Sequence, residues 1–86
     1  MKYSPAQPIY LEANNAIINV PTNIDQQLSY ITFINKGKAD GTIDFGDGNV
    51  APLSAGESLT LPYVGRPYGL MVVDGTGTLI KVIYVA

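Results

Sequence analysis

Residues 41–86 alternate short runs of β-branched and aromatic residues with turns rich in glycine, and this rhythm constrains the fold more than any other feature. In residues 41–48, 52–61 and 72–79, glycine together with Asp, Asn or Ser separates stretches that favour strands. Short strands spaced by roughly 8–12 residues, with turn signals between them, are typical of a sandwich or small barrel. Nowhere do apolar residues keep a helical period for three turns, so the sequence predicts an all-β protein.

Seven strands are predicted, or eight if the N-terminal segment contributes one. They include residues 16–20, 28–35, 42–45, 57–61, 70–73 and 78–85. Residues 28–35 and 79–85 carry apolar side chains on both faces, which indicates strands that are central or covered on both sides. The predicted fold is a small antiparallel β-sandwich of jelly-roll or Ig-like type with an extended N-terminal arm. Its expected core residues are Leu28, Ile31, Phe33, Ile43, Phe45, Leu59, Leu61, Val72, Ile80 and Val82.

The first fifteen residues are predicted to form the arm, which divides the chain into an arm at 1–15 and a sandwich domain at 16–86. Pro5 and Pro8 lack an amide donor and favour extended backbone, so this segment fits an arm or an edge strand. The apolar triplet Ile9, Tyr10 and Leu11 otherwise lacks a face to pack on, which favours docking on a neighbouring subunit.

The composition removes most kinds of catalytic and metal site. The chain has no histidine and no cysteine, which excludes Ser-His-Asp and Cys-His sites and nearly all zinc and redox sites. An acidic cluster remains at Asp40, Asp44, Asp47 and Asn49. It lacks the downstream glutamate of a calcium loop and fits the stabilisation of turns better. We therefore predict a non-enzymatic protein with no cofactor and no bound metal.

Charge is sparse, and this shapes the expected partners. Charged residues make up 14% of the chain, against about 25% in typical proteins, and apolar residues make up 47%. A small domain with so few charges exposes apolar surface, and self-association is a common way to cover it. The five basic residues are spread along the chain, which argues against nucleic acid as a partner. No apolar run reaches the roughly 18 residues of a membrane span, and no export signal is predicted.

Three segments supply the candidate contact residues. Tyrosine and arginine are enriched among interface anchors, and tyrosine rings can also stack on sugars. An alternative for the loop that follows residue 61 is that its two tyrosines only cap the end of the sandwich. The candidates are Tyr3, Ile9, Tyr10 and Leu11 in the arm, Tyr63, Arg66 and Tyr68 in the loop, and Leu79, Ile83 and Val85 on the second face of the last strand.

Four segments in order carry a resemblance to a known group of proteins. They are residues 33–37 (Phe-Ile-Asn-Lys-Gly), a strand that ends in Phe45-Gly46, residues 52–61, and the final strand at 75–84. This order resembles small all-β virion proteins of tailed bacteriophages, which decorate or cement the head or belong to fibres and tail parts. The resemblance implies a structural protein without catalytic residues, made in the host cytoplasm and located in the virion. It also implies a symmetric homo-oligomer, with a trimer favoured, bound to the major capsid protein or another virion protein.

A second resemblance is local and concerns residues 43–48. Their sequence Ile-Asp-Phe-Gly-Asp-Gly is similar to the Trp-Asp-Phe-Gly-Asp-Gly signature of polycystic-kidney-disease-type (PKD) domains, with Ile43 in place of the tryptophan. The histidine-containing pattern further along that family is not matched. This resemblance implies an Ig-like module. The alternative function is therefore a PKD-like or carbohydrate-binding β-sandwich that uses Tyr63 and Tyr68.

Overall fold

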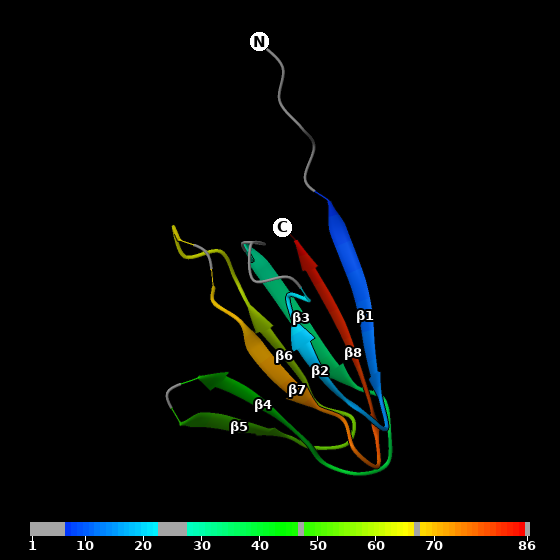
Figure 1. The fold of residues 1–86 in the computed structure, drawn as a ribbon. Helices are drawn as coiled ribbons and strands as arrows, with labels where there is room; N and C mark the ends of the chain where they lie inside the picture. The colour runs from blue at the N-terminus through cyan, green and yellow to red at the C-terminus, as the bar shows by residue number, and fades with distance from the viewer. Residues whose placement is uncertain (1–6, 23–27, 47, 67, 86) are drawn as a thin grey trace.

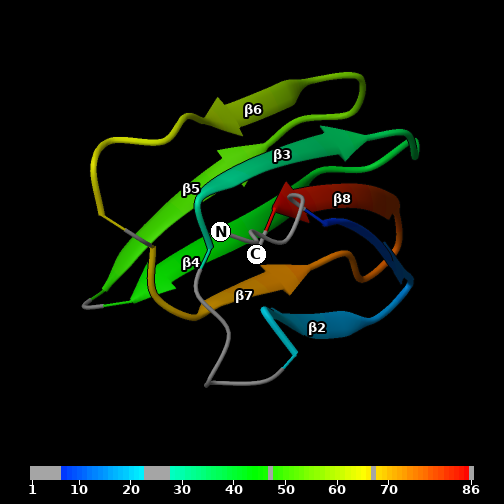
Figure 2. The same ribbon diagram turned by 90° about the horizontal axis from the view of Figure 1, so that it is seen from above.

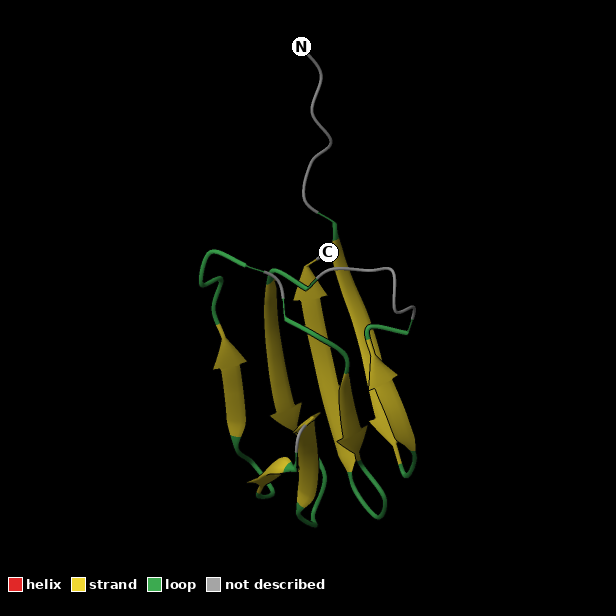
Figure 3. Ribbon diagram, turned by 60° about the vertical axis from the view of Figure 1, so that its left-hand side comes forward, coloured by secondary structure: helices red, strands yellow, loops and turns green. Residues whose placement is uncertain are grey.

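A computed structural model of the chain describes residues 7–22, 28–46, 48–66 and 68–85, which form eight β-strands (Figure 1). Figure 3 shows only strands, turns and loops in this described part, and the predicted all-β class is confirmed. The same residues include no helix that is long and apolar enough to cross a membrane. The strands are β1 (Pro8–Asn14), β2 (Ile17–Val20), β3 (Tyr30–Asn35), β4 (Gly41–Gly46), β5 (Asn49–Leu53), β6 (Ser58–Leu61), β7 (Met71–Asp74) and β8 (Leu79–Val85).

The strands form two antiparallel sheets of four strands each, which pack face to face (Figures 1 and 2). Sheet A has the strand order β1-β8-β3-β6, and sheet B has the order β2-β7-β4-β5. The chain folds back on itself like one long hairpin, because β1 pairs with β8, β2 with β7, β3 with β6 and β4 with β5. In sheet A, the pairing of β3 with β8 joins the β1–β8 pair to the β3–β6 pair. In sheet B, the pairing of β4 with β7 joins the β2–β7 pair to the β4–β5 pair. The predicted antiparallel β-sandwich is therefore confirmed.

Residues 8–14 of the predicted arm are a strand of the sandwich. This strand, β1, pairs with β8 along its whole length. Its inward side chains Ile9 and Leu11 pack against the core, and Ala13 is fully buried. The sequence fits an arm or an edge strand here, and the structure shows an edge strand for these residues. A domain boundary after residue 15 would therefore separate β1 from the rest of sheet A. Residues 1–6 of the arm lie outside the described part.

Inward-pointing residues of both sheets form one hydrophobic core. Burying an aliphatic or aromatic side chain contributes about 1.5–3 kcal/mol, so this core is the main source of stability. The predicted core residues that are fully buried are Leu28, Ile31, Phe33, Ile43, Ile80 and Val82. Those that are half-buried and pack against the core are Phe45, Leu59 and Leu61. The core also contains residues that are absent from the predicted set: Ala13, Val20, Leu53, Met71, Val73 and Tyr84.

The prediction that Val72 lies in the core is wrong. The buried residues of β7 are its neighbours Met71 and Val73. Val73 lies opposite the buried Ile43 of β4, whereas Val72 lies opposite Asp44 on the outer face of sheet B. Successive side chains of a strand point to opposite faces, so a one-residue change in register moves every side chain to the other side.

One end of the sandwich is held together by the buried side chain of Asn35, the last residue of β3. Its Nδ2 donates to the carbonyl oxygens of Ala39 and Leu53, each at 2.9 Å. Its Oδ1 accepts from the Gly37 amide at 3.0 Å and from the Thr78 hydroxyl at 2.7 Å. Both donors and both acceptor positions of the amide are therefore used. Asn35 links the loop after β3, the end of β5 and the start of β8.

Two glycines at this end allow backbone segments to approach closely. A Cβ atom at Gly75 would lie 2.2 Å from the carbonyl oxygen of Ala13 on β1. A Cβ atom at Gly37 would lie 1.9 Å from the hydroxyl oxygen of Thr78. Real Cβ atoms do not approach other atoms so closely, so both positions require glycine.

Candidate interaction surface

The outer face of sheet A carries a cluster of apolar side chains, which we call the sheet A patch: Pro8, Tyr10, Tyr30, Ile83 and Val85. Tyr10 lies opposite Ile83 in the strand register. Pro8 and Tyr30 lie opposite Val85 from its two sides. Tyr10 is 51% exposed, and Tyr30 and Ile83 are 40% exposed each. A contiguous exposed apolar patch of this kind is a candidate site of interaction.

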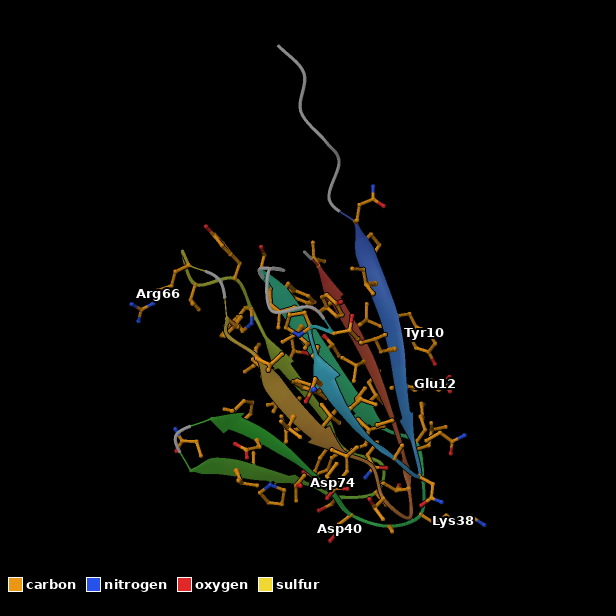
Figure 4. The ribbon with its side chains drawn as sticks, in the orientation of Figure 1. Tyr10, Glu12, Lys38, Asp40, Arg66 and Asp74 are labelled. Atoms are coloured by element: carbon orange, nitrogen blue, oxygen red, sulfur yellow. The ribbon has the colours of Figure 1, made fainter. Side chains whose placement is uncertain are left out.

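Polar side chains border the patch. Glu12 lies opposite Lys81 in the register, and both are on the outer face of sheet A. The Tyr10 hydroxyl donates a hydrogen bond to a Glu12 carboxylate oxygen, and Figure 4 shows both side chains pointing away from the sandwich. This hydrogen bond, with smaller effects from burial and from the charge of Glu12, raises the pKa of Tyr10. The phenol therefore remains a neutral donor at physiological pH.

Three of the predicted interface residues, Tyr10, Ile83 and Val85, lie in the sheet A patch. Leu79 is half-buried on the same outer face, opposite Asn14 at the far end of β1. Tyr30 also belongs to the patch, although it is absent from the predicted interface residues. The apolar residues on both faces of residues 28–35 were the sequence signal for it.

Two other candidates, Ile9 and Leu11, point inward and pack against the core. They are only half-buried because β1 is an edge strand of the sheet. The structure therefore places them at the open side of the sandwich rather than on its outer face. Tyr3 lies outside the described residues.

The end of the sandwich opposite Asn35 contains a hollow of about 310 Å³. Most of its lining is apolar, and the polar groups of its lining side chains are the amide of an asparagine and the hydroxyl of a tyrosine. The hollow opens between the β4–β5 hairpin and the segment that connects β6 to β7. The lining residues are Phe45, Asn49, Leu61, Tyr68, Gly69 and Met71.

The predicted loop candidates do not act as one group. Tyr63 is 62% exposed, and Arg66 is exposed and extends away from the sandwich in Figure 4. Tyr68 is half-buried, packs against the core and donates its hydroxyl to the Pro62 carbonyl oxygen. Its backbone also forms an isolated bridge with Leu28. Tyr68 therefore caps the sandwich, whereas Tyr63 and Arg66 remain available at the surface.

Three of the described carboxylates serve turns. The Asp44 carboxylate accepts from the Gly46 amide at 2.8 Å. The Ser54 amide and, to a smaller extent, its side chain bond to Glu57 and lower the pKa of that carboxyl group. The amide of the residue two positions after Asp74 lowers the pKa of that group in the same way. Within the described residues, no group of three or more acidic side chains is placed to hold a metal ion.

No family model matches the chain, and no curated protein matches it. Among solved structures, the crystal structure of PirA matches with a TM-score of 0.54 at 12% identity, over 100% of this chain and 99% of PirA. The crystal structure of the ethanolamine utilization protein Q (EutQ) from Salmonella typhimurium LT2 matches with a TM-score of 0.50 at 17% identity, over 96% of this chain and 58% of that one. A de novo designed double-stranded β-helix gives a TM-score of 0.41 at 15% identity, over 98% and 91%. At such identities the likeness to PirA and EutQ concerns the fold alone.

Proposed function

We propose that this chain is a non-enzymatic structural protein that assembles into a symmetric homo-oligomer and decorates or cements a larger protein shell, such as a bacteriophage capsid. The observation that carries the proposal is the sheet A patch. Its side chains come from β1, β3 and β8, which are hydrogen-bonded neighbours in one sheet. A rigid apolar surface rich in tyrosine is typical of the centre of a protein–protein interface.

The size of the domain also supports self-association. A chain of 86 residues buries only about 60–65% of the surface that its unfolded form exposes. It has no cysteine, so a disulfide cannot add to its stability. Covering the patch with a second copy would contribute about 25 cal/mol for each Å² of apolar surface removed from water.

We further propose that the sandwich is of the jelly-roll type. Two four-stranded sheets in which the first strand pairs with the last, and the next strands pair inward in turn, correspond to a long hairpin rolled into two layers. Ig-like sandwiches have seven or nine strands in a different order. Jelly rolls occur in viral capsid proteins and in lectins, so this architecture is compatible with a virion role, while the patch carries the functional argument.

Sedimentation velocity tests the oligomer and its surface together. The unmodified chain should sediment as a closed oligomer at micromolar concentration. Ile83→Lys places a charge in the patch and should raise the dissociation constant by about tenfold or more, equivalent to about 1.4 kcal/mol. Val50→Lys is the matched control, because Val50 is a β-branched residue that is 54% exposed on the edge of sheet B. A monomeric chain at about 100 µM, well above typical dissociation constants, would overturn the proposal, as would equal effects of the two lysines.

The virion part of the proposal has its own test. Phage particles purified on a density gradient from the source strain should contain this chain in a fixed ratio to the major capsid protein, as measured by mass spectrometry. Particles without the chain would refute the virion role and would leave the oligomer unaffected.

A carbohydrate-binding module is the second candidate, and the exposed ring of Tyr63 favours it. Tyr63 lies in the segment that connects β6 to β7, and this segment also supplies Tyr68 and Gly69 to the lining of the apolar hollow. This alternative predicts a monomer that is retained on immobilised cellulose, chitin or starch. Tyr63→Ala should abolish retention, whereas Val64→Ala, at the equally exposed neighbouring position, should preserve it. An unretained chain removes this candidate.

A further inference from the structure

We propose that the outer edge of β1 pairs antiparallel with β1 of a second copy, centred on Leu11, so that sheet A continues across a twofold axis. The inference rests on the self-association proposed above and adds to it a contact at the sheet edge, which would place the sheet A patches of the two copies side by side on one continuous face. Identical strands that meet edge to edge form an isologous contact, which generates a dimer. The basic unit is therefore a dimer, in place of the trimer that the virion resemblance implies.

Of the four sheet edges formed by the described strands, β1 is the least protected. It has seven residues, and within the described part it pairs only with β8. The edge strands β6 and β2 have four residues each. The fourth edge, β5, contains Pro52, which cannot donate to a neighbouring strand. In β1 the proline, Pro8, stands at the first position and the single charged residue is Glu12, so little prevents a second strand from pairing.

Self-complementarity selects the register. With Leu11 on the twofold axis, Tyr10 of each copy lies directly opposite Glu12 of the second copy. The Tyr10 hydroxyl already donates to Glu12 within one strand, so the same donor and acceptor can pair between copies. A register centred on Glu12 would set two carboxylates directly opposite each other, which is destabilising. A register centred on Tyr10 would leave Ala13 and Asn14 unpaired.

The inner face of the strand supports the same contact. Ile9 and Leu11 point toward the core yet keep part of their apolar surface exposed. In the proposed dimer, Leu11 faces its own counterpart and Ile9 faces Ala13 of the second copy. The contact therefore covers apolar surface at the open side of each sandwich, and this burial adds to the backbone hydrogen bonds of the new strand pair.

Disulfide crosslinking between introduced cysteines tests this register directly, because the chain has no cysteine of its own. The variants Tyr10→Cys and Glu12→Cys are mixed and oxidised, and their disulfides are identified by mass spectrometry. In the proposed register, position 10 of one copy lies directly opposite position 12 of the second copy, within disulfide distance. In a dimer of a single variant, the two cysteines lie diagonally across the strand pair and farther apart. The mixture should therefore crosslink at least about tenfold faster than either variant alone. Asn19→Cys, at an exposed position on the β2 edge, is the control and should not crosslink.

The outcomes separate this inference from the proposed function. The experiment is run at a concentration where sedimentation has been measured, with variants whose circular dichroism matches that of the unmodified chain. If the variants still sediment as oligomers and the mixture crosslinks no faster than each variant alone, β1 pairing is refuted and self-association stands. If the unmodified chain also sediments as a monomer and the variants do not crosslink, both are refuted.

Discussion

Replacing Asn35 with alanine tests how much the hydrogen-bonded end contributes to stability. The change removes four side-chain hydrogen bonds and leaves their partners in place. The bonds to the Leu53 carbonyl oxygen and the Thr78 hydroxyl are buried, so each lost bond costs about 1–3 kcal/mol. The Gly37 amide and the Ala39 carbonyl oxygen are only partly buried and can bond to water, so they add less.

The expected loss for Asn35→Ala is thus about 3–5 kcal/mol in the free energy of unfolding. A chain of this length is expected to have a total stability of about 4–13 kcal/mol. The variant should therefore be only marginally folded at 25 °C. The matched control is Asn19→Ala, which removes an exposed asparagine from β2 and should change stability by less than about 0.5 kcal/mol.

Urea unfolding followed by circular dichroism and tyrosine fluorescence measures both variants, since the chain has six tyrosines and no tryptophan. All variants are compared at one protein concentration, because oligomer formation itself stabilises the folded state. A loss below about 1 kcal/mol for Asn35→Ala, with an unchanged slope against urea, would refute the reasoning. A double-mutant cycle with Thr78→Val should show a coupling of about 0.5–3 kcal/mol, because the two side chains bond directly.

Three further predictions follow from single contacts. Gly75→Ala should lower the thermal midpoint strongly, because its Cβ would overlap a carbonyl oxygen of β1, whereas Gly69→Ala, with open space around it, should have little effect. Val73→Ala should cost about 2–3 kcal/mol in urea unfolding and Val72→Ala less than about 1 kcal/mol, because only the first is a buried core residue. The lowered pKa of Glu57 means that its stabilising effect is present above its ordinary pKa and is lost as the pH falls through the folded value. Unfolding measured across the acid range should therefore show a weaker pH dependence for Glu57→Gln.

The fold was predictable where local signals decide it. Glycine turns and β-branched runs indicated most strands of the C-terminal half, because turn chemistry and strand propensity act over a few residues. The register of β7 was not predictable in this way. Val72 and Val73 are identical side chains, and the choice between them depends on pairing with β4.

The contacts of Asn35 were also beyond local reasoning. An asparagine that precedes Lys36 and Gly37 reads as a turn residue, and its bond to the Gly37 amide fits that interpretation. Its bond to Thr78, however, spans 43 residues of sequence. Such a contact becomes visible only when the order of strands in both sheets is known.

The sheet A patch combines both kinds of information. Tyr10 was predicted as a contact residue because the apolar triplet of the arm lacked a face to pack on. Ile83 and Val85 were predicted because apolar side chains occupy both faces of the last strand. These three residues form one surface with Tyr30 because β8 pairs with both β1 and β3. The loop candidate Tyr68 turned inward instead, since a half-buried tyrosine satisfies its hydroxyl with a nearby backbone carbonyl.

The pairing of the first strand with the last has a consequence for assembly. Tyr10 and Ile83 come from opposite ends of the chain, so the patch exists only after β1 has docked on β8. Pairing between distant segments costs loop-closure entropy before it contributes contacts, and such pairs are slow to form. A partly folded chain would therefore lack the complete patch and the ordered β1 edge. If the proposed self-association uses this surface, it selects chains whose sheet A is complete. The exposed edge strand would then be protected from pairing with incompletely folded copies.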